Sequence, residues 1–300
     1  SAQNDGKGHS QTYLNENGTP RLPITVFKAG SCTAREKFFL PGGAWRVIDI
    51  PALFAVIEHP EQGTIVFDTG YSPRFYEGTR QFPFKIMAYT TPTTVTDDDT
   101  AVAHVRGLGR DPADVRWLVL SHFDPDHYGG LKDFPNARIV CSHRAWAAVA
   151  GKTGLAAMKV RLLPGHLPED MAARVLLLPD PDGPPIGVFP ASLDIFGDSS
   201  IRLVELPGHA TGQMGAFLTR SDGTEMFLAA DSCWNMASLE NDSYGGGLHR
   251  WIAVDRRGQD ATYATMRRLR REWPSLLIVP AHCPRMWREL SAAQQGEINE

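Results

Sequence analysis

One short segment, residues 121–127, constrains the fold of this chain more than any other part of it. It follows an apolar run at 115–120 with the composition of a buried strand, and it precedes the start of a helix at 128–131. Its residues with metal-binding side chains are His122, Asp124, Asp126 and His127. In an extended backbone, side chains two positions apart point the same way, so His122 and Asp124 would share one face. The segment therefore predicts a strand-to-helix loop that could hold one cation on each face.

Taken alone, this loop is explained equally well by a solvated turn in which Asp side chains cap the helix. Three further donor residues favour a metal site, and each directly follows an apolar segment: His209, Asp231 and His282. The ends of strands are where a rigid scaffold presents functional side chains. We therefore expect these donors to meet the loop in space.

The order and setting of these residues resemble the metallo-β-lactamase superfamily, whose pattern is a His-x-His-x-Asp-His loop followed by a distant His, an Asp and a final His. The resemblance extends from the strand and turn at 64–70 to His282. It implies an α+β fold, a four-layer αββα sandwich with two face-to-face sheets covered by helices. The divalent-metal ligands that it implies are His122, Asp124 and His209 for one ion, Asp126, His127 and His282 for the other, and Asp231 as the bridge.

The resemblance also gives a role to Asp68, in the turn at 68–70. The Asp at this place in the family orients a metal-binding histidine, which fixes the tautomer of the ligand. A turn Asp before Gly explains the same residue nearly as well.

This sequence departs from the family pattern at Asp124, where the family has its second histidine. Zinc is the usual metal of the family, but a carboxylate donor favours harder ions such as manganese or iron. The flavodiiron branch of the fold has a Glu at this place, so a dinuclear iron redox protein is an alternative function. We expect it to be the weaker one, because no flavodoxin-like domain follows His282 in this sequence.

The chemistry that a pair of ions implies is hydrolysis. A water bridging two cations is acidic enough to supply hydroxide at neutral pH, and one cation can also polarise a carbonyl. We predict attack on a lactone or ester, with Asp126 or Asp231 carrying the proton to the leaving group. The apolar insertions favour a substrate with a hydrophobic substituent, and the sequence is similar to the N-acyl homoserine lactonase branch. A thioesterase or arylesterase of the same fold, or a binding protein that has lost catalysis, are the alternatives.

Composition limits the kinds of protein and partner that this chain could represent. With 300 residues, of which 42% are hydrophobic, the chain can build one large core. A net charge of −4 gives no general attraction to phosphate backbones, so we expect no nucleic-acid partner. No apolar run is long enough to span a membrane. The cysteines form no CxxC pair and are expected to be reduced. We expect a cytoplasmic protein, while the start at Ser1 leaves a processed, exported form open.

The predicted organisation is a disordered or loosely docked arm at 1–20 and a single metallo-hydrolase domain at 21–300. Strand-like runs at 24–28, 45–58 and 64–67 predict an antiparallel meander, and the runs at 213–219 and 225–230 predict a hairpin. Helices are predicted at 168–175 and 260–272. Insertions at about 71–98 and 152–198 are predicted to be irregular segments that cap the site. The aromatic residues of the first insertion could instead form a satellite core or a homodimer contact. The glycine-rich stretch at 244–247, with Tyr244 and the nearby His249, is a lesser candidate for a flexible substrate loop.

Overall fold

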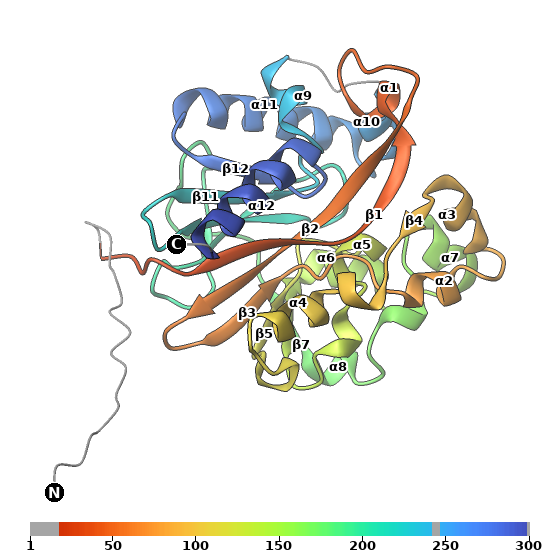
Figure 1. Ribbon diagram of the computed structural model, residues 1–300, viewed down its shortest axis with the longest axis horizontal. Coiled ribbons are helices and arrows are strands. Elements are labelled where there is room, and N and C mark those ends of the chain that lie inside the picture. The colour runs from red at the N-terminus through yellow and green to blue at the C-terminus, as the bar shows by residue number, and fades with distance from the viewer. Residues whose placement is uncertain (1–17, 242–246, 299–300) are drawn as a thin grey trace, which may run out of the picture.

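The computed structural model describes residues 18–241 and 247–298 (Figure 1). Most of the predicted arm at 1–20, and Tyr244 of the candidate substrate loop, lie outside the described residues. Within them, no helix has the length and apolar character needed to cross a bilayer.

Among the described residues, the first sheet has seven strands in the order β4-β1-β2-β3-β5-β6-β7. They are β1 (Ile24–Arg35), β2 (Val47–His59), β3 (Gly63–Phe67), β4 (Thr93–Thr94), β5 (Trp117–Val119), β6 (Arg138–Ser142) and β7 (Val175–Leu178). β1, β2 and β3 form the antiparallel meander that the sequence predicts. β3, β5, β6 and β7 are mutually parallel, so their carboxyl ends lie at one edge of the sheet.

The second sheet has five described strands in the order β12-β11-β10-β9-β8. They are β8 (Leu193–Asp194), β9 (Arg202–Glu205), β10 (Met214–Thr219), β11 (Glu225–Ala230) and β12 (Leu277–Pro280). The predicted hairpin is confirmed, because β10 pairs antiparallel with β11. β12 then runs parallel to β11, which places the residues after these two strands side by side.

The helices are mostly short. They are α1 (Glu36–Phe39), α2 (Arg74–Gly78), α3 (Lys85–Thr90), α4 (Ala101–Gly107), α5 (Pro125–Tyr128), α6 (His143–Val149), α7 (Gly154–Lys159), α8 (Met171–Arg174), α9 (Met236–Glu240), α10 (Leu248–Ile252), α11 (Arg256–Glu272) and α12 (Pro284–Ile298). Single 3₁₀ turns occur at 97–99, 112–114, 131–133 and 164–166.

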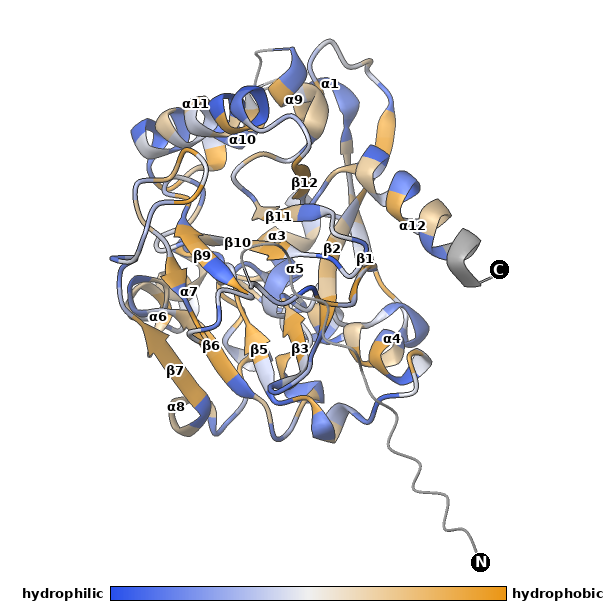
Figure 2. Ribbon diagram, turned by 90° about the vertical axis from the view of Figure 1, so that its left-hand side faces the viewer, coloured by the Kyte–Doolittle hydropathy of each residue, from blue (hydrophilic) through white to orange (hydrophobic). Residues whose placement is uncertain are grey.

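The alternation of side chains along β2 builds the layers. Leu53, Ala55 and Ile57 point into a core between the two sheets, whereas Phe54 and Val56 point into a core under α4 and α6. A third core lies between the five-stranded sheet and α11. Figure 2 shows the apolar strands inside and the polar outer face of α11. The α+β sandwich predicted from the resemblance is confirmed.

The two predicted insertions are more ordered than the sequence suggests. The first contains α2, α3 and β4, and Tyr71, Phe75, Met87 and Val95 from it form a buried core with Leu163 of the second. We name this core the Tyr71 cluster; it matches the satellite-core alternative. The helix expected at 168–175 is shorter: it begins at Met171 and ends at Arg174, because the apolar run that follows pairs with β6 as β7.

Candidate metal centre

The loop after β5 is held in shape by Asp68, which follows β3. Its Oδ1 accepts a hydrogen bond from the backbone N–H of Ser121 at 2.8 Å, and its Oδ2 accepts one from Ser121 Oγ at 2.7 Å. Asp68 has a left-handed backbone, with φ of 58°, a region that Asp enters more readily than most residues. The end of one parallel strand thus fixes the loop after its neighbour.

The solvated-turn alternative fails at Asp124. This residue occupies the N-cap position of α5, and Pro125 is the first helical residue, as is common at helix starts. However, the Asp124 side chain makes no capping hydrogen bond, and the residue is buried. Its carboxylate points into the protein rather than capping the helix.

The other predicted donors come from the second sheet. His209 lies between β9 and β10, Asp231 directly follows β11, and His282 follows β12. Gly208 allows the first of these loops to pass against α11, since a Cβ built on it would lie 2.3 Å from Gln259 Cα, and its φ is +130°. Only glycine fits such a close backbone approach.

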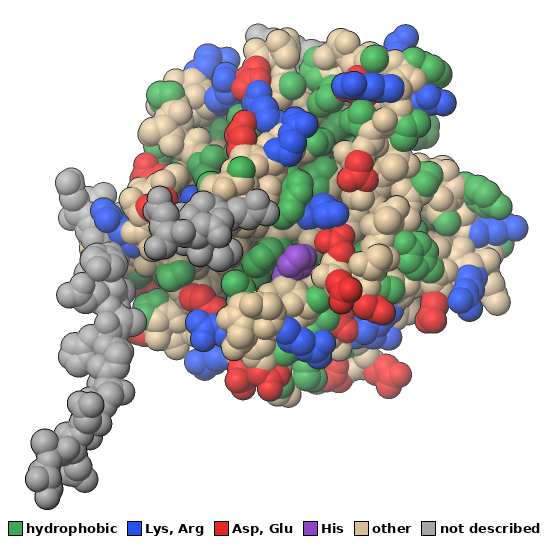
Figure 3. Space-filling model, viewed as in Figure 1, with side chains coloured by type: hydrophobic (Ala, Val, Ile, Leu, Met, Phe, Trp, Pro, Cys, Tyr) green, Lys and Arg blue, Asp and Glu red, His purple; other side chains and the backbone are tan. Residues whose placement is uncertain are grey.

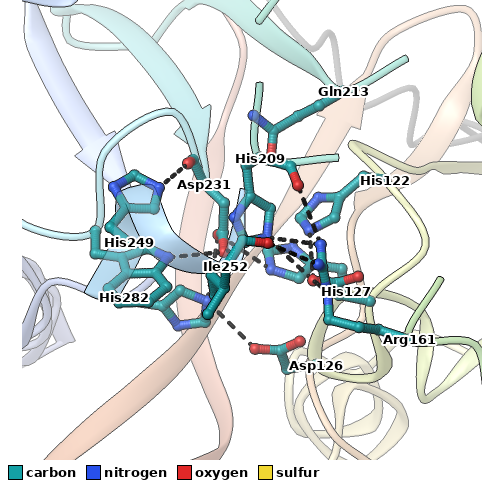
Figure 4. Close-up of polar contacts among 12 residues, drawn as sticks. His122, Asp126, His127, Arg161, His209, Gln213, Asp231, His249, Ile252 and His282 are labelled. Carbon is teal, nitrogen blue, oxygen red and sulfur yellow. Dashed lines mark hydrogen bonds and ion pairs between the residues drawn. The ribbon is translucent and has the colours of Figure 1, made fainter. Parts of the chain in front are cut away.

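The structure brings all seven predicted donor residues together (Figure 4). Their ligand atoms form three overlapping groups, and within each group the atoms lie within 4.8 Å of one another. The groups are His122, His127 and Asp231; His122, Asp124 and His209; and Asp126, His127 and His282.

Four residues, which we name the Asp126 set, surround one position: Asp126, His127, Asp231 and His282. Asp231 Oδ1 lies 3.2 Å from His127 Nε2 and 3.2 Å from His282 Nε2. Asp126 Oδ2 is also 3.2 Å from His282 Nε2. The buried atoms His127 Nε2 and Asp231 Oδ1 have no hydrogen-bond partner among the described residues. Buried polar atoms without partners are costly, so the set fits a divalent cation that would satisfy them.

The outer nitrogens of the two histidines support the same conclusion. His127 Nδ1 lies 2.8 Å from Asp68 Oδ2, and His282 Nδ1 lies 2.8 Å from the carbonyl oxygen of Pro51. Each acceptor holds the ring proton on Nδ1, which leaves the Nε2 lone pair facing inward. The arrangement matches the role that the resemblance gives to Asp68.

The three remaining residues, the Asp124 set, are His122, Asp124 and His209. Asp124 Oδ2 lies 3.0 Å from His209 Nε2 and 3.6 Å from His122 Nε2. The same oxygen accepts a hydrogen bond from Arg161 Nε at 2.8 Å. Sequence reasoning missed Arg161: the region 152–198 was expected to line the site, but no pattern singles out this residue.

The buried carboxylates remain ionised. Burial by itself raises the pKa of Asp231, but when no cation is bound the positive charge of protonated His282, His127 and His209 more than offsets this and holds the pKa well below its usual value. For Asp124, burial also acts to raise the pKa, and the Arg161 guanidinium outweighs it, so the pKa is well below its usual value. Concentrated negative charge in a buried site attracts cations.

Apolar side chains flank the donors. Phe39, Ile50 and Trp234 form one cluster, the Trp234 cluster, against which Leu248 and Ile252 pack. The half-buried Cys32 packs against both the Trp234 cluster and the Tyr71 cluster. In Figure 3, hydrophobic side chains gather at the right-hand edge, over the regions of α3 and α1 in Figure 1.

His249 does not lie in an exposed substrate loop. It is buried, its ring stacks on Trp234 with centroids 4.5 Å apart, and its Nε2 lies 2.8 Å from the backbone oxygen of Asp231. Burial lowers the pKa of His249 to about 3, so the ring is neutral at physiological pH and its Nε2–H can donate to the backbone oxygen of Asp231.

Known proteins resemble this chain in sequence. Residues 50–280 match the model of the metallo-beta-lactamase superfamily. The N-acyl homoserine lactonase AttM of Azorhizobium caulinodans is 26% identical over 243 residues, which are 80% of this chain and 84% of that protein. The probable metallo-hydrolase Rv2300c of Mycobacterium tuberculosis is 29% identical over 201 residues, 63% of this chain and 61% of that one.

Solved structures share the fold. An N-acyl homoserine lactone hydrolase with N-hexanoyl-L-homoserine bound at its catalytic metal centre superposes with a TM-score of 0.69, at 15% identity, over 90% of this chain and 96% of that one. The dizinc quorum-quenching lactonase AidC has a TM-score of 0.59 at 15% identity, over 91% of this chain and 90% of that one.

Proposed function

The chain belongs to the metallo-beta-lactamase superfamily, and from this premise we propose that it is a metal-dependent hydrolase that opens a lactone or ester carrying a hydrophobic substituent. The observation that supports the proposal most is the Asp126 set, in which donors from three separate loops come together and two of them, His127 and Asp231, have buried atoms without a hydrogen-bond partner among the described residues.

A divalent cation held by this set would supply a hydroxide nucleophile at neutral pH and polarise a substrate carbonyl. Asp68, Pro51 and His249 hold His127, His282 and Asp231 in place, so the ligands need little reorganisation.

Asp126 is the residue we assign to proton transfer. Its side chain is 17% exposed, compared with 4% for Asp231, so it is the more accessible of the two carboxylates. A carboxylate at that place can pass a proton to the alkoxide that leaves when the ester bond breaks. Asp231, which is fully enclosed, serves to position the centre.

The substrate class is proposed from the surroundings. The half-buried apolar side chains packed on the Trp234 and Tyr71 clusters, among them Cys32, Leu248 and Ile252, leave apolar surface beside the donors, and an acyl chain that leaves water gains free energy on such surface. Relatives that carry the name N-acyl homoserine lactonase favour a lactone as the bond that is cleaved. The family pattern predicts two ions, zinc or, with Asp124, manganese or iron; hydrolysis requires only the ion of the Asp126 set.

The redox alternative depended on Asp124 as a ligand of an iron pair. Arg161 Nε lies 2.8 Å from Asp124 Oδ2, so this carboxylate already has a cationic partner. This contact makes Asp124 a poor ligand for an iron pair.

Thioesters and aryl esters are the alternative substrates. A metal-bound hydroxide would attack their carbonyl carbon as it would attack that of a lactone, so the same activity assay includes them.

We would assay the metal-loaded protein on N-acyl homoserine lactones of increasing chain length, simple esters, aryl esters and thioesters. We expect lactone opening, with kcat/KM rising with acyl length. Asp231→Asn is expected to lower kcat/KM by at least about 100-fold, because it removes a charge at the ion. His143→Ala, on the exposed side of α6, is the control and should be unchanged. A metal-loaded protein that hydrolyses none of the panel would overturn the proposal.

A further inference from the structure

We propose that the centre holds one divalent cation, at the Asp126 set, and that the guanidinium of Arg161 takes the place of a second cation at the Asp124 set. The inference rests on the proposed function only in that the chain uses a metal. It departs from the two-ion pattern that the sequence resemblance predicts.

Arg161 approaches the atoms that a cation at the Asp124 set would need. Its Nε donates to Asp124 Oδ2 at 2.8 Å, and its Nη2 is 3.5 Å from His209 Nε2. Figure 4 shows the side chain pointing in among these donors. A second divalent ion would have to share its ligands with a fixed positive charge at short range, and the two would repel each other.

The guanidinium is held there by backbone groups as well. Nη1 donates to the carbonyl oxygen of Ile252 at 3.1 Å, and Nη2 donates to that of His209 at 3.1 Å. Arg161 therefore joins the segment after α7 to the end of α10 across the site. With hydrogen bonds to three different residues, the guanidinium is fixed in orientation and cannot simply swing aside when an ion arrives.

The backbone of Arg161 is a separate observation. Its φ is +56°, in the left-handed region, which a residue with a long side chain seldom adopts. The position follows the end of α7, where such a conformation is common, but glycine or asparagine is the usual residue there. Unfavourable backbone conformations persist where surrounding contacts require them, and they cluster at functional sites.

The second oxygen that would face such an ion is also engaged. Asp231 Oδ2, which lies 3.3 Å from His209 Nε2, accepts a hydrogen bond from the indole N–H of Trp234 at 3.0 Å. In contrast, Asp231 Oδ1 faces the Asp126 set and has no hydrogen-bond partner in the described part of the chain. The two oxygens of one carboxylate thus differ in what they can still bind.

His209 differs from the other histidines in its outer nitrogen. Its buried Nδ1 has no hydrogen-bond partner among the residues described, whereas His127 and His282 are held through theirs. A ring with its proton on Nε2 can donate to Asp124 Oδ2 at 3.0 Å. His122 remains available, since its Nε2 groups with the inward-facing atoms of His127 and Asp231. Within the Asp124 set, the contact between Asp124 Oδ2 and His209 Nε2 is therefore a hydrogen bond, whereas His122 Nε2 still has no partner among the described residues.

Metal stoichiometry tests the proposal. Each protein is incubated with excess Zn²⁺, freed of unbound metal by gel filtration and analysed for zinc per chain. We expect one ion in the wild type. The double variant Asp124→His with Arg161→Ala restores the family histidine and removes the guanidinium, and we expect it to bind two. Asp124→His with Arg144→Ala removes an exposed arginine of α6 instead and should bind one.

A second readout does not depend on the variants. The electron paramagnetic resonance spectrum of the Mn²⁺-loaded wild type is expected to be that of an isolated ion, without the exchange coupling of a close pair.

Circular dichroism checks that each variant used for the zinc analysis is folded. If the variant with Arg161→Ala does not fold, Arg161→Gln takes its place.

Two zinc ions in the wild type, or a coupled Mn²⁺ pair, would overturn the inference. A folded double variant that still binds one ion would refute the role assigned to Arg161. Both results leave the hydrolase proposal standing if lactones are opened. A wild type that binds no ion and opens no ester removes the proposed function and the inference with it.

Discussion

Asp68 illustrates, at the scale of a single residue, how a side chain that need not touch a cation can determine whether one is bound. Its Oδ2 lies 2.8 Å from His127 Nδ1, and both its oxygens hold Ser121. We expect Asp68→Asn to weaken Zn²⁺ binding about 10- to 100-fold, because the ring loses its charged partner. Asparagine tolerates the left-handed backbone at this position, so the change removes the charge and one acceptor oxygen without adding backbone strain.

Calorimetric Zn²⁺ titration measures this effect. Asp111→Asn is the matched control. Asp111 caps the 3₁₀ turn at 112–114 and is not one of the donors or their partners, and asparagine caps a helix start nearly as well as aspartate. An unchanged dissociation constant in Asp68→Asn would show that the contact with His127 does not orient a ligand.

At this same scale, the sequence predicted the donors and one of their partners, Asp68, but not the others. His122, Asp126 and Asp231 stand out because each has a metal-binding side chain at the end of an apolar run. Arg161 lies 37 positions from Asp124, in a stretch without periodicity, and its role depends on a contact that only the folded chain makes. Trp234 is similar, because its indole N–H is aimed at Asp231 by the loop after β11.

At the scale of elements, close backbone approaches place the loops that carry the donors. Gly208→Ala would put a Cβ 2.3 Å from Gln259 Cα in α11, so the loop that bears His209 must move. We expect a loss of at least about 2 kcal/mol in the free energy of unfolding, from overpacking and from the unfavourable φ. Urea denaturation measures it.

Gly109→Ala provides the comparison for that variant. Gly109 also has a positive φ, of +72°, but a Cβ there would meet nothing within 4 Å. The cost should be about 1 kcal/mol, from the backbone conformation alone. Equal losses in the two variants would mean that contact with α11 does not constrain the His209 loop.

The elements that could be predicted from the sequence are those whose own residues show a regular apolar pattern. The meander of β1 to β3, the hairpin of β10 and β11, and α11 all have regular spacing of apolar residues. α2 and α3 have five and six residues, too few to be stable alone, and they exist because Phe75 and Met87 are buried in the Tyr71 cluster. Tertiary contacts of this kind are invisible to local patterns.

At the scale of the whole molecule, both sheets contribute to one centre. The loop after β5 supplies Asp126 and His127, and the second sheet supplies Asp231 and His282. The order of these donors along the chain predicted the fold, because it resembles the pattern of the metallo-β-lactamase superfamily. The number of ions was not predictable in this way, since it depends on what fills the space between the donors.

Stability of the whole domain also depends on pH through Asp99, which binds β1 from the turn before α4. It accepts a hydrogen bond from Gly30 N at 3.1 Å and pairs with Lys28 Nζ at 3.2 Å. Burial acts to raise the pKa of Asp99, but His104, Lys28 and Gly30 outweigh it, and the pKa is lowered from 3.8. Its contribution is therefore present above the unfolded pKa and lost as pH falls through the folded one.

Asp99→Asn should lower the free energy of unfolding by about 1 kcal/mol at neutral pH, as expected for a partly buried ion pair with a hydrogen bond. The difference from the wild type should shrink below the unfolded pKa of 3.8. Urea denaturation at several pH values measures both. A difference that is constant with pH would show that the charge of Asp99 does not matter.

The central claim is that the Asp126 set binds a divalent cation, and a crystal structure of the zinc-loaded protein with anomalous data at the zinc edge tests it most directly. We predict one anomalous peak about 2.0–2.3 Å from donor atoms of His127, His282 and the neighbouring carboxylates. We predict none between Asp124 and His209, where Arg161 should remain. A zinc-loaded crystal without a peak at the Asp126 set would contradict the account.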